Sequence, residues 1–285
     1  MSEKEKGTNN SRFREIISVL RKHNITHGIS PKKLRLIMED LGPTFVKIGQ
    51  IMALHSDILP KAYCDELMEL CTDARPMPFE EAVSVIDESY GRSWKKVFAS
   101  IEETPIGSAS IAQVHRAVLK SGEEVVVKIQ RKGIYEMMAR DIEFIRKAIK
   151  LMPPISLKGM ADFDLVLDEL WSVTRDEMNF LTEASNIEEF ARRNKDVNFV
   201  QTPVLYQQYT TVHVLVMEYI DGCGIDEKDK LLEDGYDLKE IGSKLVDNYI
   251  KQVMDDGFFH ADPHSGNVKI LSLIHISEPT RLRCI

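Results

Sequence analysis

The chain has 285 residues, of which 43% are hydrophobic and 29% are charged, with 15 Gly and 11 Pro. This ordinary globular composition excludes collagen-like, low-complexity and largely disordered proteins, and it predicts one large or two medium domains. The formal net charge of −8 argues against a nucleic-acid-binding protein that relies on a general basic surface. Four scattered cysteines without a CxxC pair favour a reducing compartment over a zinc site or a disulfide framework.

The N-terminal segment is predicted to be a basic amphipathic extension over residues 1–33. Residues 1–35 carry nine Lys/Arg and three Glu, and the apolar side chains within 12–23 share one helical face. Such a helix packs on its own domain or lies on an anionic membrane surface. Neither a signal-peptide core nor an apolar run long enough to span a membrane is present, so we expect a cytoplasmic protein, peripheral at the membrane face.

Caps and breakers delimit a series of predicted helices up to about Ser100. These helices cover residues 31–41, 44–54 and 79–90. Alternating apolar residues then predict a hairpin of two strands over 111–119 and 123–130.

The elements after this hairpin are predicted from the same patterns. They are helices over 134–151 and 162–193, strands over 203–206 and 211–220, and a helix over 237–255. The predicted order of elements is helices, a hairpin, a helical part, strands and a final helix. This order is typical of an α+β fold rather than of alternating βαβ units.

The most informative segment for function is FFHADPHSGN at 258–267. Asp262 precedes Asn267 by five residues, which is the spacing of a kinase catalytic loop. There the Asp accepts or orients the proton of the attacking hydroxyl, and the Asn holds a magnesium ion. Two alternatives stay open, namely a hydrolase metal site formed by His260, Asp262 and His264, and a simple polar turn.

Two features upstream fit a nucleotide site. Small residues over 107–112 would let backbone N–H groups approach a phosphate, although such a stretch also occurs in ordinary tight loops. Lys128 in the second strand needs a counter-charge or a ligand oxygen if it is buried, and otherwise points to water from an edge strand. Glu177 lies on the core-facing stripe of the 162–193 helix and is the predicted partner of Lys128. Asn179 and Glu183 fall on another face and are expected to be solvated.

Taken in order, these features resemble the motifs of the UbiB/ADCK (aarF-domain) family of atypical kinase-like proteins over about residues 34–270. The resemblance covers three further sets of residues. Lys47, Gly49 and Gln50 resemble the K-x-G-Q motif, and Met217, Glu218 and Tyr219 resemble the hinge. Pro105 to His115 resemble the alanine-rich loop that replaces the kinase glycine-rich loop. Within it, the residues that would cover the phosphates are Gly107, Ser108, Ala109, Ser110, Ile111 and Ala112.

The resemblance implies a two-lobed, protein-kinase-like α+β fold with an added N-terminal helical subdomain and a truncated larger lobe. The implied segments are a K-x-G-Q subdomain at 34–104, an N-lobe at 105–220, the start of a C-lobe at 221–270, and a non-native tail at 271–285. It also implies ATP or ADP and Mg²⁺ as cofactors, and an ATPase or a lipid or small-molecule phosphotransferase in isoprenoid-quinone biosynthesis. A lipid or quinone precursor and a membrane surface are the implied partners, and nucleic acid is not. A non-catalytic nucleotide-binding scaffold is the alternative.

The resemblance also assigns roles to residues. Asp262, Lys128 and Glu177 would be catalytic and Asn267 would bind the metal. The residues that would gate the site are Lys47, Gly49, Gln50, Asn179 and Glu183.

Two departures from the family pattern stand out. The E-x-D motif ends in Asn179, which cannot form the ion pair with Lys47 that an Asp would form, and Glu183 is expected to compensate. The tail LSLIHISEPTRLRCI shows neither strand alternation nor a helix long enough to pack, and no Asp follows Asp262 where D-F-G is expected. We therefore expect these 285 residues to be inactive in phosphotransfer, with the apolar helices that anchor many relatives lying in a full-length protein.

Overall fold

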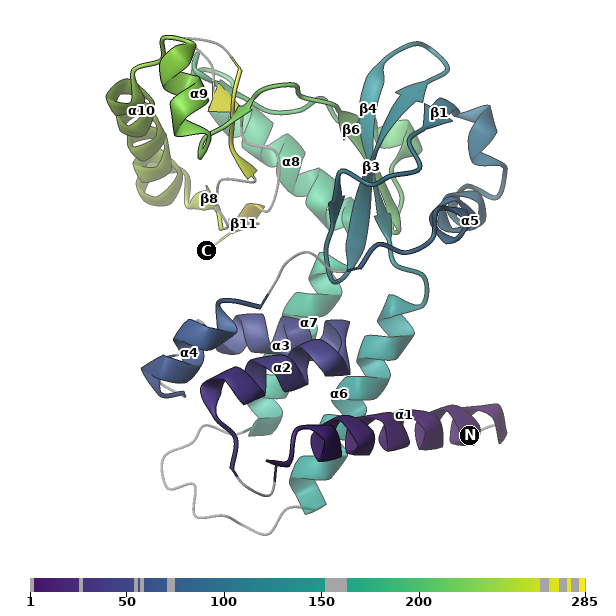
Figure 1. Cartoon of the computed structure of the whole chain (residues 1–285). Coiled ribbons are helices and arrows are strands. Elements are labelled where there is room, and N and C mark those ends of the chain that lie inside the picture. Colours follow the sequence, from purple (N-terminus) through teal and green to yellow (C-terminus); the bar gives the residue numbers. More distant parts are fainter. Residues whose placement is uncertain are drawn as a thin grey trace. The chain divides into compact units, whose positions relative to one another are not determined.

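The structure is a computed structural model of the chain, drawn in Figure 1. It describes residues 3–25, 28–53, 56, 59–70, 75–151, 163–261, 267–271, 276–277 and 282–284. The chain divides into two compact units. Unit 1 comprises Met1–Met77, Gly107–Gln113 and Gln130–Met178, and unit 2 comprises Pro78–Ile106, Val114–Ile129 and Asn179–Ile285.

Unit 1 is mainly helical. Its elements are α1 (Glu3–Lys22), α2 (Pro31–Leu41), α3 (Pro43–Met52), α4 (Lys61–Leu67), β2 (Gly107–Ser108), α6 (Ile134–Leu151) and α7 (Phe163–Glu177). The predicted caps are confirmed, because Ser30 accepts a hydrogen bond from the Lys33 N–H at the start of α2, and Gly42, at φ 93°, separates α2 from α3.

The N-terminal helix α1 packs on its own unit. Its buried Ile16 contacts Ile37 and Leu41 of α2 in one apolar cluster. Arg12 donates from Nε and Nη2 to the carboxylate of Asp141 on α6, at 2.9 and 2.8 Å. Thr44 of α3 donates to the same carboxylate at 2.7 Å, and Asp141 is only 1% exposed. This buried carboxylate is therefore satisfied by groups from two other helices of unit 1.

Unit 2 holds most of a five-stranded antiparallel sheet whose main path is β1–β3–β4–β6, with β2 paired to β3 (Figure 1). The strands on this path are β1 (Phe98–Ile101), β3 (Ala112–Leu119), β4 (Glu124–Gln130) and β6 (Val214–Glu218). Lys128 of β4 lies opposite Leu215 of β6. The residues on either side of Lys128, Val127 and Ile129, are fully buried, which fixes the orientation of the strand.

Helices and short strands complete unit 2. They are α5 (Phe79–Tyr90), η2 (Trp94–Lys96), α8 (Phe180–Asn194), β5 (Val200–Gln201), η3 (Gln207–Tyr209), β7 (Cys223–Gly224), α9 (Lys228–Glu233), α10 (Leu238–Lys251), the π-helix η4 (Gln252–Asp256), β8 (Phe258–His260), β9 (Lys269–Ile270), β10 (Ile276–Ser277) and β11 (Leu282–Cys284). The α+β prediction is confirmed, and the structure combines helices with mainly antiparallel sheets, in which β5 and β10 form a parallel pair.

Three sequence predictions about these elements are wrong. The segment 162–193 is two helices rather than one, because Asn179 leaves the helical conformation and accepts the Leu181 N–H at 3.1 Å as the N-cap of α8. Residues 98–101 form a strand, although helices were predicted up to about Ser100. The predicted strand over 203–206 is reduced to a single bridge, between Leu205 and Met217.

The tail, whose sequence shows no strand alternation, nevertheless contributes the short strands β10 and β11. Backbone atoms of β10 pair with β5 and β9, and those of β11 pair with β8. Strand edges offer backbone donors and acceptors to any extended segment, so this pairing needs no alternation of side chains.

Candidate functional site

Lys128 forms the central polar contact of unit 2. Its Nζ lies 2.8 Å from Oε1 and 2.7 Å from Oε2 of Glu183, in the first turn of α8. The same ammonium lies 5.0 Å from the ring centroid of Phe180, which is fully buried. The Lys128 side chain is still 21% exposed, so it is held in position and remains accessible.

The predicted pairing of Lys128 with Glu177 is wrong. The prediction carried one helical period across residues 178 and 179, but α7 ends at Glu177 and α8 begins at Phe180. Glu183, expected to be solvated, has a side chain only 14% exposed, whereas Leu181, four residues after Glu177 and thus on the same predicted helical face, is 47% exposed. The new cap at Asn179 therefore changes which residues face inward.

Glu177 instead pairs with Lys47 inside unit 1. Lys47 Nζ lies 2.9 Å from Oε1 and 2.6 Å from Oε2 of Glu177. The Lys47 side chain is 7% exposed, and that of Glu177 is 21% exposed. A lysine on an apolar helix face usually extends its amine to water, but this one is nearly enclosed with its counter-ion.

Gly49 allows a close approach of helices in unit 1. A Cβ at this position would lie 2.4 Å from Leu70 Cδ1 and 3.2 Å from Met38 Sδ. Only glycine therefore fits here without displacing its neighbours. Gln50 follows on α3 and is half-buried. Asn179, predicted to gate the site, acts structurally as the N-cap of α8.

The loop over 107–112 has one end in the core of unit 1 and one outside it. The side chain of Ile111 packs with Ile134 and Met138, so at this residue only the backbone can meet a ligand. A Cβ at Gly107 would meet open space, so packing does not require glycine there. Arg131 donates hydrogen bonds to this loop, a contact that the sequence analysis missed.

The N–H groups of the two predicted hinge residues bond within unit 2. The Glu218 N–H donates to Val204 O at 2.8 Å, and the Tyr219 N–H donates to Glu124 O at 3.1 Å. The guanidinium of Arg116 lies 4.2 Å from the centre of the Tyr219 ring. The hinge residues are therefore fixed by the sheet edge.

Asp262 and His264 lie outside the described residues. Asn267 is described and half-buried, and His260 is fully buried at the end of β8. Among the described residues, no cluster of three His, Cys, Asp or Glu side chains could hold a metal ion. The assignments of Asp262 and Asn267, and the alternative hydrolase triad, therefore stay predictions.

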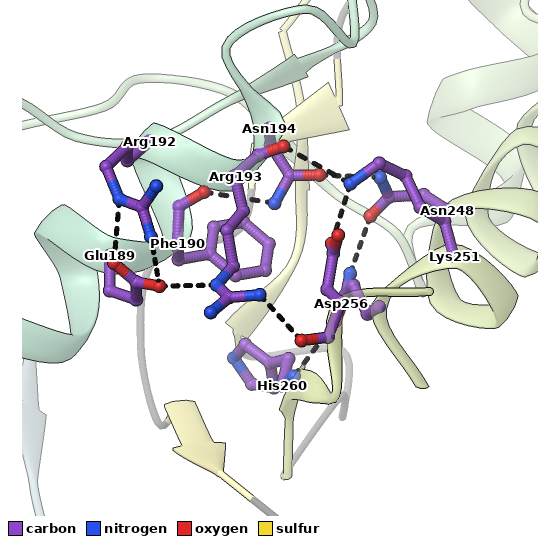
Figure 2. Close-up of polar contacts among 10 residues, drawn as sticks. Glu189, Phe190, Arg192, Arg193, Asn194, Asn248, Lys251, Asp256 and His260 are labelled. Atoms are coloured by element: carbon purple, nitrogen blue, oxygen red, sulfur yellow. Dashed lines mark hydrogen bonds and ion pairs between the residues drawn. The ribbon is translucent and has the colours of Figure 1, made fainter. Parts of the chain in front are cut away.

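A chain of buried amides joins α8 to the strand that precedes Asp262, as Figure 2 shows. Asn248 Nδ2 donates to Asn194 Oδ1 at 2.8 Å, and Gln252 Nε2 donates to Asn248 Oδ1 at 2.5 Å. The His260 N–H then donates to Gln252 Oε1 at 2.9 Å. All four residues are at most 4% exposed, so this chain fixes β8 relative to the helix that carries Glu183.

An ionic layer flanks the amide chain (Figure 2). Lys251 Nζ lies 2.6 Å from Asp256 Oδ2, and Arg193 Nη1 donates to the backbone oxygen of Asp256 at 2.6 Å. Arg193 also pairs with Glu189 on its own helix. These contacts hold η4, the π-helix from which Gln252 projects, against α8. π-Helical turns of this kind are often found at functional sites.

Comparison with known proteins identifies the family. The ABC1 atypical kinase-like domain matches residues 69–276, which is more than half of the chain. The chain belongs to this family. It is 45% identical over 241 residues to an uncharacterized protein in the hydrogenase 1 5′ region of Clostridium pasteurianum, covering 85% of this chain and 46% of that one. It is 36% identical over 240 residues to the probable protein kinase UbiB of Pseudomonas fluorescens, covering 83% and 44%.

A solved structure supports the same fold. Rv3197 of Mycobacterium tuberculosis, determined in a complex with erythromycin, superposes with a TM-score of 0.62 at 27% identity, covering 82% of this chain and 59% of that one. The predicted family and kinase-like fold are therefore confirmed. The chain spans less than half the length of the two curated relatives above. None of its described helices is both long and apolar enough to cross a membrane.

Proposed function

We propose that this member of the ABC1 atypical kinase-like family binds the phosphates of ATP or ADP at Lys128, with Glu183 orienting the lysine. The observation that carries the proposal is the ion pair in which both oxygens of Glu183 hold a lysine whose side chain is 21% exposed. An ammonium has three donors, so two bonds to Glu183 leave one donor for a phosphate oxygen. This is the arrangement that phosphoryl-transfer enzymes of the kinase type use.

The remaining roles follow the family resemblance. Backbone N–H groups over 107–112 would contact the phosphates, and the hinge at Glu218 and Tyr219 would lie beside the base. Asp262 would accept the proton of the attacking hydroxyl or water, and Asn267 would contribute an oxygen ligand to Mg²⁺. A bound Mg²⁺ would supply charge neutralisation at the phosphates.

The K-x-G-Q region is proposed to control access to the nucleotide. Lys47 of this motif forms its ion pair with Glu177. The ion pair therefore does not require an aspartate at position 179. Gly49 supports it through close packing.

The acceptor is proposed to be a lipid or another small molecule, or water in an ATPase, in isoprenoid-quinone biosynthesis at a membrane surface. The support is the family and the likeness to a protein named UbiB, which is described as a probable protein kinase.

Nucleotide binding without turnover is a second candidate function. The Lys128–Glu183 ion pair supports this candidate equally, because it would hold a nucleotide whether or not the nucleotide is turned over. Measuring ATP hydrolysis beside ATP binding separates the two candidates. Binding with Mg²⁺-dependent hydrolysis supports the enzyme, and binding without hydrolysis supports the scaffold.

The test is calorimetric titration of the protein with ATP and with ADP in the presence of Mg²⁺. Lys128→Met is expected to weaken binding about 10- to 100-fold, because a charge-assisted hydrogen bond contributes about 1.5–3 kcal/mol. Lys120→Met, in the exposed hairpin turn, is the matched control and should bind as the wild type does. The proposal is wrong if the wild type shows no saturable binding, or if Lys128→Met binds equally well while remaining folded by circular dichroism.

A further inference from the structure

Arg131, the first residue after β4, makes an unusual set of contacts inside unit 1. Its Nε donates to Ala109 O at 2.8 Å, and its Nη2 donates to Ser108 Oγ at 2.8 Å. The same Nη2 donates to Arg75 O at 2.9 Å. Its backbone N–H donates to Ile111 O at 2.8 Å. One residue thus holds the 108–111 loop through both its side chain and its backbone.

These contacts determine which way the peptide groups of the loop face. In a trans peptide the C=O and the following N–H point in opposite directions, and no cis peptide is present among the described residues. The carbonyl oxygens of Ala109 and Ile111 face Arg131. The N–H groups of Ser110 and Ala112, which belong to the same two peptides, therefore point away from it.

We infer that Arg131 is the positioning residue of the phosphate-binding loop. By holding the carbonyl side of the loop, it presents the N–H groups of Ser110 and Ala112 to the phosphates of a nucleoside di- or triphosphate. The inference rests on the proposed function, since it assigns the direction of a loop proposed to contact phosphates. Arg131 itself touches no ligand in this account and acts through the loop.

The side chain has to be arginine for this role. The planar guanidinium offers several donors at fixed angles, and here it reaches Ala109, Ser108 and Arg75 at once. A lysine at this position carries one compact ammonium and cannot span all of these acceptors. The backbone bond to Ile111 survives any substitution except proline, so the loop keeps one attachment when the side chain is changed.

A merely structural role and a positioning role differ in which ligands they affect. If Arg131 only stabilised the unit, its loss would weaken the binding of every ligand alike. If it aims backbone N–H groups at phosphates, its loss weakens the binding of ATP and ADP and leaves that of adenosine unchanged.

The experiment compares wild type, Arg131→Met and Arg131→Lys in calorimetric titrations with ATP, ADP and adenosine. Arg140→Met is the matched control, because Arg140 is an exposed arginine whose Nε donates to a carbonyl of its own helix, that of Glu136. We expect Arg131→Met to weaken ATP and ADP binding about tenfold or more, with Arg131→Lys giving little rescue and adenosine unaffected. Equal losses for adenosine, or wild-type affinity in Arg131→Met, would overturn the inference.

Amide hydrogen exchange without nucleotide tests the contact itself. Peptides spanning 106–114 should exchange faster in Arg131→Met than in wild type, while Arg140→Met matches wild type. Unchanged exchange overturns the loop contact alone and leaves the proposed function standing. A wild-type protein that binds neither ATP nor ADP overturns the proposed function and, with it, the role of Arg131 in nucleotide binding.

Discussion

Each unit of the molecule holds a lysine against a glutamate, and the two ion pairs differ in which partner faces solvent. In unit 1 the Lys47 side chain is 7% exposed and the Glu177 side chain is 21% exposed. In unit 2 the order is reversed, with Lys128 at 21% and Glu183 at 14%. The cation is enclosed in the first pair, and the carboxylate is the more enclosed partner in the second.

This difference separates two uses of the same chemistry. A lysine whose side chain is only 7% exposed is poorly placed to meet an anion from solvent, and its burial is tolerated because a counter-ion is in place. Lys128 contacts the carboxylate of Glu183 and the ring of Phe180 but is still 21% exposed, so its ammonium can also contact a phosphate. The Lys47–Glu177 pair is therefore suited to holding unit 1 together, and the Lys128–Glu183 pair is suited to the binding role proposed above.

The largest expected effect comes from removing each lysine in turn. Lys47→Met should lower the free energy of unfolding of unit 1 by about 3 kcal/mol, because it leaves Glu177 without its lysine at the C-terminal end of α7, where a negative charge is unfavourable. Lys128→Met should cost unit 2 only about 1 kcal/mol, because Glu183 stays in the first turn of α8, where a negative charge is favourable.

The two tryptophans allow each unit to be followed separately during urea unfolding. Trp171 lies in unit 1 and Trp94 in unit 2, so Trp94→Phe and Trp171→Phe backgrounds each report one unit. The double variant Lys47→Met/Glu177→Gln should recover part of the loss. Equal losses for the two lysine variants would contradict the contrast between the pairs.

A smaller effect is expected from Gly49→Ala, which tests whether close packing supports the Lys47 side of the comparison. The added methyl group would lie 2.4 Å from Leu70 Cδ1, so we expect a loss of about 2 kcal/mol in unit 1. Gly107→Ala is the matched control, because its Cβ would meet open space. The Trp171 fluorescence transition measures both, and a neutral Gly49→Ala would show that α3 can move away from Leu70 without cost.

The sequence predicted most elements because their signals are local. Ser30 and Gly42 mark a helix start and a helix end by their own chemistry, and both predictions are confirmed. The Lys128 strand follows from a run of β-branched residues, and the family follows from the order of several loose motifs, which the domain match confirms.

The site was predicted less well because one local signal was overlooked. Asn in a helix interior competes for backbone hydrogen bonds, and it favours caps. Reading Asn179 as an N-cap would have ended α7 at Glu177 and placed Glu183 in the first turn of a new helix. The contacts of Arg131 and Gln252 have no such signal. The side-chain acceptors of Arg131 lie 22 or more residues away, and the His260 N–H that donates to Gln252 lies 8 residues away.

The smallest effect expected is a pH dependence confined to unit 2. His115 on β3 is fully buried beside Phe79, and desolvation lowers the pKa of its imidazole. Unfolded histidine titrates near its ordinary pKa of about 6.5, so the unfolded chain binds more protons between that value and the lower folded pKa. The contribution of His115 to the free energy of unfolding of unit 2 is therefore complete above about pH 6.5, and it is lost progressively as the pH falls below that value.

In unit 1 the group with a lowered carboxyl pKa is Asp40, which responds at lower pH. Hydrogen bonds from Lys22 and His23 lower the pKa of Asp40. Its contribution to the free energy of unfolding is present at pH values above the ordinary carboxyl pKa, and it is lost as the pH falls through the lowered pKa of the folded state. Urea unfolding between pH 7.5 and 5.5 should thus weaken the Trp94 transition more than the Trp171 transition. His115→Gln retains a donor for the Glu102 carbonyl and should remove this excess sensitivity. If the excess persists in His115→Gln, another group in unit 2 binds the proton.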